Sequence, residues 1–276
     1  GGIGDDVLVT MGAAGGTSGG SGTDTFNGAD GNDTLALDDV AGLVGYTVDL
    51  LGGTGSVTAT VSSSFSISNI ENVDGSDGVD NIFGDANANR LYGWDAADNL
   101  SGGDGNDTLN GGSGNDSLAG GNGTDTADYS SDPDSNADGF GVAVSIGGTQ
   151  TGTWQNVAYT VTVGTNGAAT DGWGNTDDLG TIGTLENVVG SMYNDAIFGN
   201  NGANSLFGGA GTDLLVGGGG NDTLDGGTVG NSISTDWVSY RGATGDGVNV
   251  DLGAGTATPR TTSNIGSDTL LNIDGV

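Results

Sequence analysis

The sequence predicts an all-β fold, a parallel β-solenoid with antiparallel β hairpins interposed between its coils. Three observations predict it. A nine-residue unit repeats in one phase through three stretches, the segments between them alternate with period two, and no stretch has the period of a helix longer than one or two turns. A short unit repeated at fixed spacing is typical of a solenoid, in which each coil packs on its neighbours.

The repeated unit is clearest at residues 75–128, where it occurs six times in succession. Its first residue is glycine, its sixth is Asp or Asn, and its eighth is usually large and apolar. The same phase opens the chain at Gly1 and returns at Gly190. The eighth residues of the central run, which we expect in the core, are Ile82, Leu91, Leu100, Leu109, Leu118 and Ala127.

Each unit divides into a tight loop and a short strand. Glycines at the first, second and fourth positions allow positive φ and close approach of neighbouring backbones, which favours a loop. Side chains two residues apart share one face of a strand, so the eighth side chain points to an interior. Two units then complete one coil. The sixth side chains of units n and n+2 are therefore expected to form rows along both edges.

These rows of carboxylates predict a bound cation. One buried apolar residue per unit offsets only a small part of the conformational entropy lost on ordering nine residues. A ligand that binds only the folded state has to supply the rest. Ca²⁺ fits, because it accepts several carboxylate and carbonyl oxygens in tolerant geometry. Zinc and copper favour His or Cys, and the chain contains neither.

Units such as GGDGNDTLN (residues 102–110) and GGSGNDSLA (residues 111–119) resemble the repeats-in-toxin (RTX) family, whose hemolysin-type nonapeptide repeats bind calcium. The resemblance implies a parallel β-roll that folds on Ca²⁺ outside the cell after type I secretion. It also implies that main-chain carbonyls of the second and fourth loop residues complete each calcium shell. Those residues are Gly103, Gly105, Gly112 and Gly114.

The candidate side-chain ligands are the residues at the sixth positions. Residues 10–18 read as a degenerate unit, which pairs Asp6 with Asp24. Five extra residues in the last run favour Asp236 over Asn231, and the neutral Asn89 and Asn204 predict weaker sites. Pairing sixth positions one coil apart predicts about eight calcium ions. The ligands are Asp6, Asp24, Asp33, Asp80, Asn89, Asp98, Asp107, Asp116, Asp125, Asp195, Asn204, Asp213, Asp222 and Asp236.

The chain is organised as three runs of units separated by β segments. We expect runs at 1–36, 75–128 and 190–240, and intervening β segments at 37–74, 129–189 and 241–276. The strings at 65–73, 180–188 and 268–276 align without gaps, and the first two lead into a new run. Alternation at 57–61 and 157–163 predicts antiparallel strands, which we expect to cover the open ends of the coil. Because the chain stops in mid-motif, we expect a segment of a longer polypeptide.

Composition limits the partners and the class of function. With 36 acidic against 3 basic residues, the net charge of -33 disfavours nucleic acid and anionic membranes as partners. No stretch of 18 apolar residues is present, so membrane insertion is not expected. The chain has no His and no Lys to serve as a catalytic base, and its carboxylates lie in regular loops rather than in a cleft. We therefore expect no catalytic function.

Two functions remain open at this stage. The first is an extracellular structural or adhesive segment of a surface layer, filament or adhesin, with calcium, further copies of itself or cell-surface polysaccharide as partners. Trp94 and Trp173 are candidate contacts for such partners. The second is the C-terminal secretion and folding module of a secreted enzyme, whose protease, lipase or polysaccharide epimerase domain lies outside these residues. Both predict a secreted, extracellular protein, and the first predicts association with the cell surface.

Overall fold

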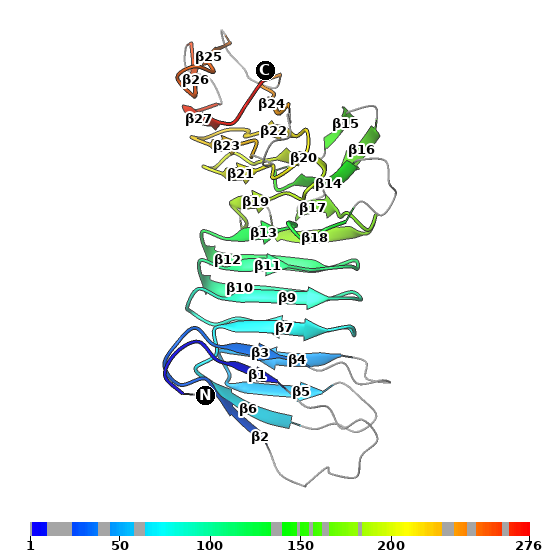
Figure 1. Cartoon of the computed structure of the whole chain (residues 1–276), viewed down its shortest axis with the longest axis vertical. Helices are drawn as coiled ribbons and strands as arrows, with labels where there is room; N and C mark the ends of the chain where they lie inside the picture. Colours follow the sequence, from blue (N-terminus) through cyan, green and yellow to red (C-terminus); the bar gives the residue numbers. More distant parts are fainter. Residues whose placement is uncertain are drawn as a thin grey trace. The chain divides into compact units, whose positions relative to one another are not determined.

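The computed structural model describes residues 2–9, 24–37, 45–57, 64–133, 140–147, 150–154, 157–161, 166–181, 184–227, 235–241, 247–260 and 265–276 (Figure 1). In these ranges the chain forms 27 strands and no helix, which confirms the predicted all-β fold. The chain divides into two compact units, unit 1 (Gly1–Asp125) and unit 2 (Thr126–Val276).

Unit 1 contains two sheets, and successive nonapeptides contribute strands to them in turn. The first sheet has the order β1 (Val7–Val9), β3 (Thr34–Ala36), β7 (Asn72–Ser76), β9 (Arg90–Trp94), β11 (Thr108–Asn110). The second has the order β2 (Asp24–Asn27), β6 (Ser64–Ser68), β5 (Thr54–Val57), β4 (Tyr46–Asp49), β8 (Asn81–Phe83), β10 (Asn99–Gly105), β12 (Ser117–Gly123). Figure 1 shows β7, β9 and β11 stacked one above another.

The register of unit 1 repeats every two nonapeptides. Leu100 of β10 pairs with Ile82 of β8 on one side and with Leu118 of β12 on the other, all in parallel strands. In the opposite sheet Leu109 pairs with Leu91 in the same way. All five side chains are fully buried. The predicted coil of two nonapeptides with an apolar eighth residue inside is therefore confirmed.

Unit 2 repeats this plan. One sheet has the order β13 (Thr126–Asp128), β19 (Asn187–Val189), β21 (Ser205–Phe207), β23 (Thr223–Asp225), β27 (Asp268–Leu271), β26 (Thr256–Pro259), β25 (Val248–Asp251). The other has the order β18 (Thr176–Thr181), β17 (Asn166–Thr170), β14 (Phe140–Ser145), β20 (Asn194–Phe198), β22 (Leu214–Val216), β24 (Trp237–Val238). A separate antiparallel hairpin joins β15 (Gln150–Trp154) and β16 (Val157–Val161).

The intervening segments form three-stranded antiparallel meanders inside the sheets. In unit 1 the meander is β4-β5-β6, and its outer strands pair in parallel with β8 and β2. In unit 2 the meanders are β14-β17-β18 and β25-β26-β27, of which β14 pairs in parallel with β20 and β27 with β23. The predicted antiparallel strands are confirmed in the described ranges. The meanders continue the sheets, and β25-β26-β27 forms the end of its sheet. That they cover the open ends of the coil stays a prediction. Of the predicted strand at 57–61, residues 58–61 lie outside the described ranges.

Candidate metal sites

The sixth side chains of the nonapeptides form a hydrogen-bonded ladder. In seven of the predicted pairs the main-chain N–H of the first residue donates to the side-chain Oδ1 of the second, at 2.8 to 2.9 Å. The pairing of residues one coil apart is therefore present in the structure, with Asp236 as the partner of Asp213. That these residues bind a cation stays a prediction. The pairs are Asp80 with Asp98, Asn89 with Asp107, Asp98 with Asp116, Asp107 with Asp125, Asp195 with Asp213, Asn204 with Asp222, and Asp213 with Asp236.

The first run differs from the prediction. The N–H of Asp6 donates to Oδ1 of Asp33 at 2.8 Å, and β1 pairs with β3. Strand β2, which contains Asp24, lies in the other sheet, so the partner of Asp6 is Asp33 and not Asp24. The reason is that β1 and β2, although consecutive among the described strands, lie in different sheets, so the prediction that the string at 10–18 is a degenerate unit gave the wrong partner. That string lies outside the described residues.

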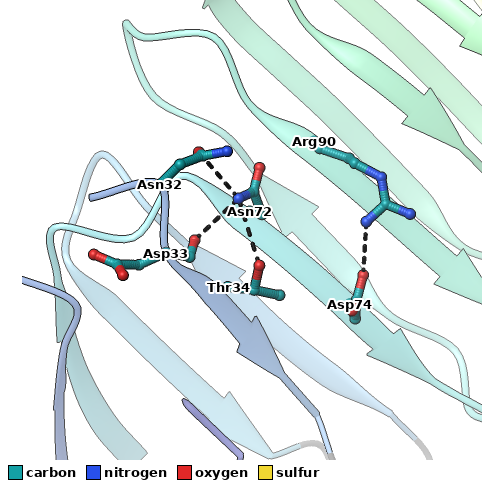
Figure 2. Close-up of polar contacts among 6 residues, drawn as sticks. All are labelled: Asn32, Asp33, Thr34, Asn72, Asp74 and Arg90. Atoms are coloured by element: carbon teal, nitrogen blue, oxygen red, sulfur yellow. Dashed lines mark hydrogen bonds and ion pairs between the residues drawn. The ribbon is translucent and has the colours of Figure 1, made fainter. Parts of the chain in front are cut away.

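Ladder residues are buried. From Asp33 to Asp236 every predicted ligand side chain that the structure describes is at most 4% exposed, whereas Asp6 is half-buried. The one ion pair in the described ranges joins Arg90 to Asp74, which is not a ladder residue (Figure 2). Beside this ion pair, the side-chain amide of Asn72 donates a hydrogen bond to the main-chain carbonyl of Asp33 and so holds the loop that contains Asp33. The carboxylates of Asp33, Asp98, Asp107 and Asp213 therefore form no ion pair with a basic side chain within the described ranges.

Several ladder carboxylates keep one oxygen open. Among the described residues, Oδ2 of Asp33, Asp98, Asp107 and Asp213 is buried and accepts no hydrogen bond. A Cβ built on Gly102 would lie 2.2 Å from Oδ2 of Asp107 and 2.6 Å from the carbonyl oxygen of Gly120. A carboxylate oxygen and a carbonyl oxygen thus converge beside the glycine. Such oxygens are the ligands that Ca²⁺ prefers, so the residues present fit this ion.

The loop glycines allow neighbouring coils to stack closely. Gly103 and Gly105 have φ of +107° and +124°, and a Cβ on either would lie 2.4 Å from a carbonyl oxygen of the preceding coil. A Cβ on Gly112 or Gly114 would come within 2.0 Å or 1.6 Å of such an oxygen. These positions therefore require glycine. Ligation by their own carbonyls stays a prediction.

No group of three or more Asp, Glu, His or Cys side chains is arranged to hold a metal ion in the described ranges. Each pair of the ladder, which we call a rung, brings together two sixth residues from adjacent coils. A cation held there depends on main-chain carbonyls or water for its remaining ligands, as the glycine-rich loops allow.

The second residue of a unit determines whether the sixth keeps an open oxygen. In four units the N–H of the second residue donates to the sixth side chain at 2.7 to 2.9 Å. In each, the second side chain also accepts an N–H from two residues further on, as Asn, Asp and Ser do in turns. The four pairs are Ser76 with Asp80, Asp85 with Asn89, Ser191 with Asp195, and Asn200 with Asn204.

In the units whose sixth residue has an open Oδ2, the second residue has a positive φ. Gly103 and Gly209, which precede Asp107 and Asp213, have φ of +107° and +105°. Ala29 and Trp94, which precede Asp33 and Asp98, have φ of +80° and +81° although neither is glycine. A left-handed non-glycine residue costs about 1–2 kcal/mol. Trp94 thus adopts the conformation of the glycine that usually stands at its position.

Burial disfavours the ionised form of Asp98 and Asp107 in the absence of a cation. Desolvation, with a smaller contribution from the charges of Asp80 and Asp116, raises the pKa of Asp98 to about 8. Desolvation and the charge of Asp125 raise the pKa of Asp107 to about 6. A bound cation would reverse this balance, because it favours the charged form.

Sequence reasoning missed three ladder residues, of which Asp274 accepts the N–H of Asp236 with its Oδ2 at 3.2 Å. The N–H of Asp222 donates to Oδ1 of Asp268 at 3.0 Å, and the N–H of Asp33 donates to Oε2 of Glu71 at 2.8 Å. Asp268 could have been found, since GSDTL at 266–270 matches positions four to eight of the unit. Glu71 could not, because it precedes a run and has no glycine in the expected positions.

Comparison with known proteins agrees with this geometry. The family model of the RTX calcium-binding nonapeptide repeat matches four stretches of the chain, residues 18–39, 74–109, 95–127 and 189–228. The chain has no match among curated proteins. No helix that could cross a bilayer occurs in the part of the chain that the structure describes. The nonapeptides of these four stretches therefore match RTX calcium-binding repeats of the hemolysin type.

Proposed function

We propose that this chain is a structural or adhesive segment of a secreted protein and that it folds when it meets extracellular calcium. RTX-repeat proteins are typically secreted calcium-binding proteins. The observation that carries the proposal is the open, buried Oδ2 of Asp98, Asp107 and Asp213, with no basic side chain paired to them in the described ranges. Buried charges of this kind destabilise a fold unless a cation compensates them.

Calcium binding is expected to be strongest inside each run. At the start of the second and third runs, the sixth side chains of the first two units already accept main-chain hydrogen bonds from Ser76, Asp85, Ser191 and Asn200. The stability of these coils therefore depends less on a bound ion. They provide each run with a first coil on which calcium-dependent coils can stack.

A non-catalytic role agrees with how the carboxylates are held. Oδ1 of Asp98 accepts the N–H of Asp80, and Oδ1 of Asp107 accepts that of Asn89. An acid fixed in a ladder of this kind is poorly placed to move a proton to or from a substrate.

Exposed aromatic side chains support an adhesive role. Trp94 is 45% exposed and stacks on Tyr92 with ring centroids 4.7 Å apart. Flat exposed rings pack on sugar rings or on aromatic residues of a second copy. Cell-surface polysaccharide and further copies of the chain are therefore the proposed partners beyond calcium.

Calorimetric titration with calcium tests the proposed sites. With Asp33 as the partner of Asp6, the predicted count remains about eight ions, one for each predicted pair of sixth side chains. Asp98→Asn should lose at least one ion or weaken binding, because a buried charged ligand becomes neutral. Asp95→Asn, on an exposed residue three positions earlier, makes the same charge change and should leave calcium binding unaltered. Equal binding by both variants and the parent chain would contradict the proposal.

A further inference from the structure

Unit 2 contains a second group of buried acids, outside the nonapeptide ladder. Asp132 lies in the turn that follows β13, and Asp171 follows β17 in the second meander. Each is 2% exposed. Asp177, in β18, is equally buried and accepts the hydroxyl proton of Tyr129 at 3.1 Å. None of these residues occupies a sixth position of a repeat.

Asp132 has an open carboxylate oxygen. Its Oδ2 accepts the N–H of Gly172 at 3.1 Å. Its Oδ1 is buried and accepts no hydrogen bond from any residue that the structure describes. A buried carboxylate oxygen without a partner costs free energy comparable to a lost hydrogen bond or more, so it requires a proton or a cation.

The turn at 171–175 lies against the main chain at Asp132 and Pro133. A Cβ built on Gly172 would lie 2.0 Å from the carbonyl oxygen of Pro133 and 3.0 Å from Cβ of Asp132. The main chain after Asp132 is therefore pressed against the start of this turn. Asp171 holds the turn itself, because its Oδ1 accepts the N–H of Asn175 at 2.6 Å.

The surroundings of Asp132 are negative. Desolvation first, and then the charges of Asp171, Asp195 and Asp128, raises the pKa of Asp132 to about 8. No Arg in the described part of unit 2 forms an ion pair. A counter-charge for the ionised form of Asp132 therefore has to come from solution.

We propose that Asp132 and Asp171, with the carbonyl oxygen of Pro133, hold one further hard divalent cation such as Ca²⁺. Since no three acidic side chains are arranged around a metal position in the described ranges, the remaining ligands are main-chain oxygens and water. The site ties the end of the second run to the turn between β17 and β18. The fold of this intervening segment then depends on calcium, as the nonapeptides do. The inference goes beyond the proposed function, which concerns the repeats alone.

Calcium stoichiometry of the full chain tests this site. Asp132→Asn removes the charge of the open carboxylate and should lower the number of bound ions by one. Asp178→Asn is the control, because it makes the same charge change on an exposed residue of β18 next to the buried Asp177. Binding is measured at a calcium concentration at which circular dichroism shows the β structure to be complete. An unchanged number of ions in Asp132→Asn would overturn the proposal.

Terbium luminescence gives a second readout, which can be used even if the Asp132→Asn variant does not fold. Trp173 lies between Gly172 and Gly174 in the turn, so it can sensitise Tb³⁺ bound there. Trp173→Phe keeps every proposed ligand and should lose the emission component that Asp171→Asn also loses. No loss in either variant would overturn the site. A chain that never folds with calcium would contradict the proposed function, whereas a chain that folds without losing an ion in Asp132→Asn contradicts this inference alone.

Discussion

The main-chain N–H of Asp107 donates to Oδ1 of Asp125, 18 residues later, at 2.8 Å. Asp107 in turn accepts the N–H of Asn89 with its own Oδ1 and keeps Oδ2 open. One carboxylate oxygen thus fixes the spacing of the coils, and the other is available to a cation. This division of roles explains why most sixth positions of the repeat are occupied by an acid.

Asp107→Ala should destabilise the second run more than Asp6→Ala does. The first change removes a buried acceptor between two coils and leaves the N–H of Asn89 without a partner, which costs about 1–3 kcal/mol before any loss of calcium. Asp6 is half-buried near the chain end, where fraying costs little. Calcium titrations followed by circular dichroism should give the higher midpoint for Asp107→Ala. Equal midpoints, or a larger shift for Asp6→Ala, would refute the ladder.

Ser76→Ala should lower stability without lowering the number of bound ions. The hydroxyl of Ser76 lies 3.1 Å from Oδ2 of Asp80, and a hydrogen bond to a buried charged group contributes about 1.5–3 kcal/mol. Ser113→Ala is the control, because that hydroxyl donates to the exposed Asp95 and its loss should cost less. Urea unfolding and calorimetry, both at saturating calcium, measure the two quantities. Loss of an ion in Ser76→Ala would show that the run start is itself a strong calcium site.

Gly103→Ala should unfold the second run at lower urea concentration than Gly53→Ala does. Gly53 has φ of +62° and a new Cβ would meet its nearest atom at 3.0 Å, so its substitution carries mainly the left-handed cost of about 1–2 kcal/mol. A Cβ on Gly103 would in addition lie 2.4 Å from the carbonyl oxygen of Asp85. Identical urea midpoints for the two variants would mean that the loops are not closely stacked.

The pH dependence of calcium binding follows from the raised pKa values. The folded pKa of Asp98, about 8, lies above the ordinary value of 3.8. Protonation therefore stabilises the ion-free fold fully below about pH 4, and this stabilisation is lost as the pH rises to about 8. Calcium binds the ionised carboxylate, so the affinity of the chain for calcium should rise with pH between about 4 and 8. In this pH range calcium binding should also release protons. Titrations in buffers of different ionisation enthalpy measure the release, and affinity independent of pH would contradict the assignment.

The repeat phase of the sequence was sufficient to predict the core and most of the ladder. Leu100 and Leu109 are buried, and Asp98 and Asp107 are paired. A fixed nine-residue phase places equivalent residues at equivalent positions of every coil. The partner of Asp6 could not be predicted in this way, since the spacing alone does not reveal which strand lies in which sheet.

Two further features needed the structure. Oδ2 of Asp80 accepts the main-chain N–H of Ser76, whereas Oδ2 of Asp107 accepts no hydrogen bond. The difference follows from φ at the second residue of the unit, which is positive at Gly103 and not at Ser76. The contrast between serine and glycine at the second position is visible in the sequence, but its consequence is not. The grouping of Asp132 with Asp171 joins residues 39 positions apart in a meander that has no repeat phase.

Far-ultraviolet circular dichroism of the full chain in chelator, and then in millimolar calcium, tests the central claim most directly. Open carboxylates at Asp98, Asp107 and Asp213 predict that the fold is unstable without a counter-ion. We expect a coil spectrum in chelator and a β spectrum in calcium, with magnesium much less effective because it requires stricter geometry and retains its water. A β spectrum of equal intensity in chelator would contradict the account.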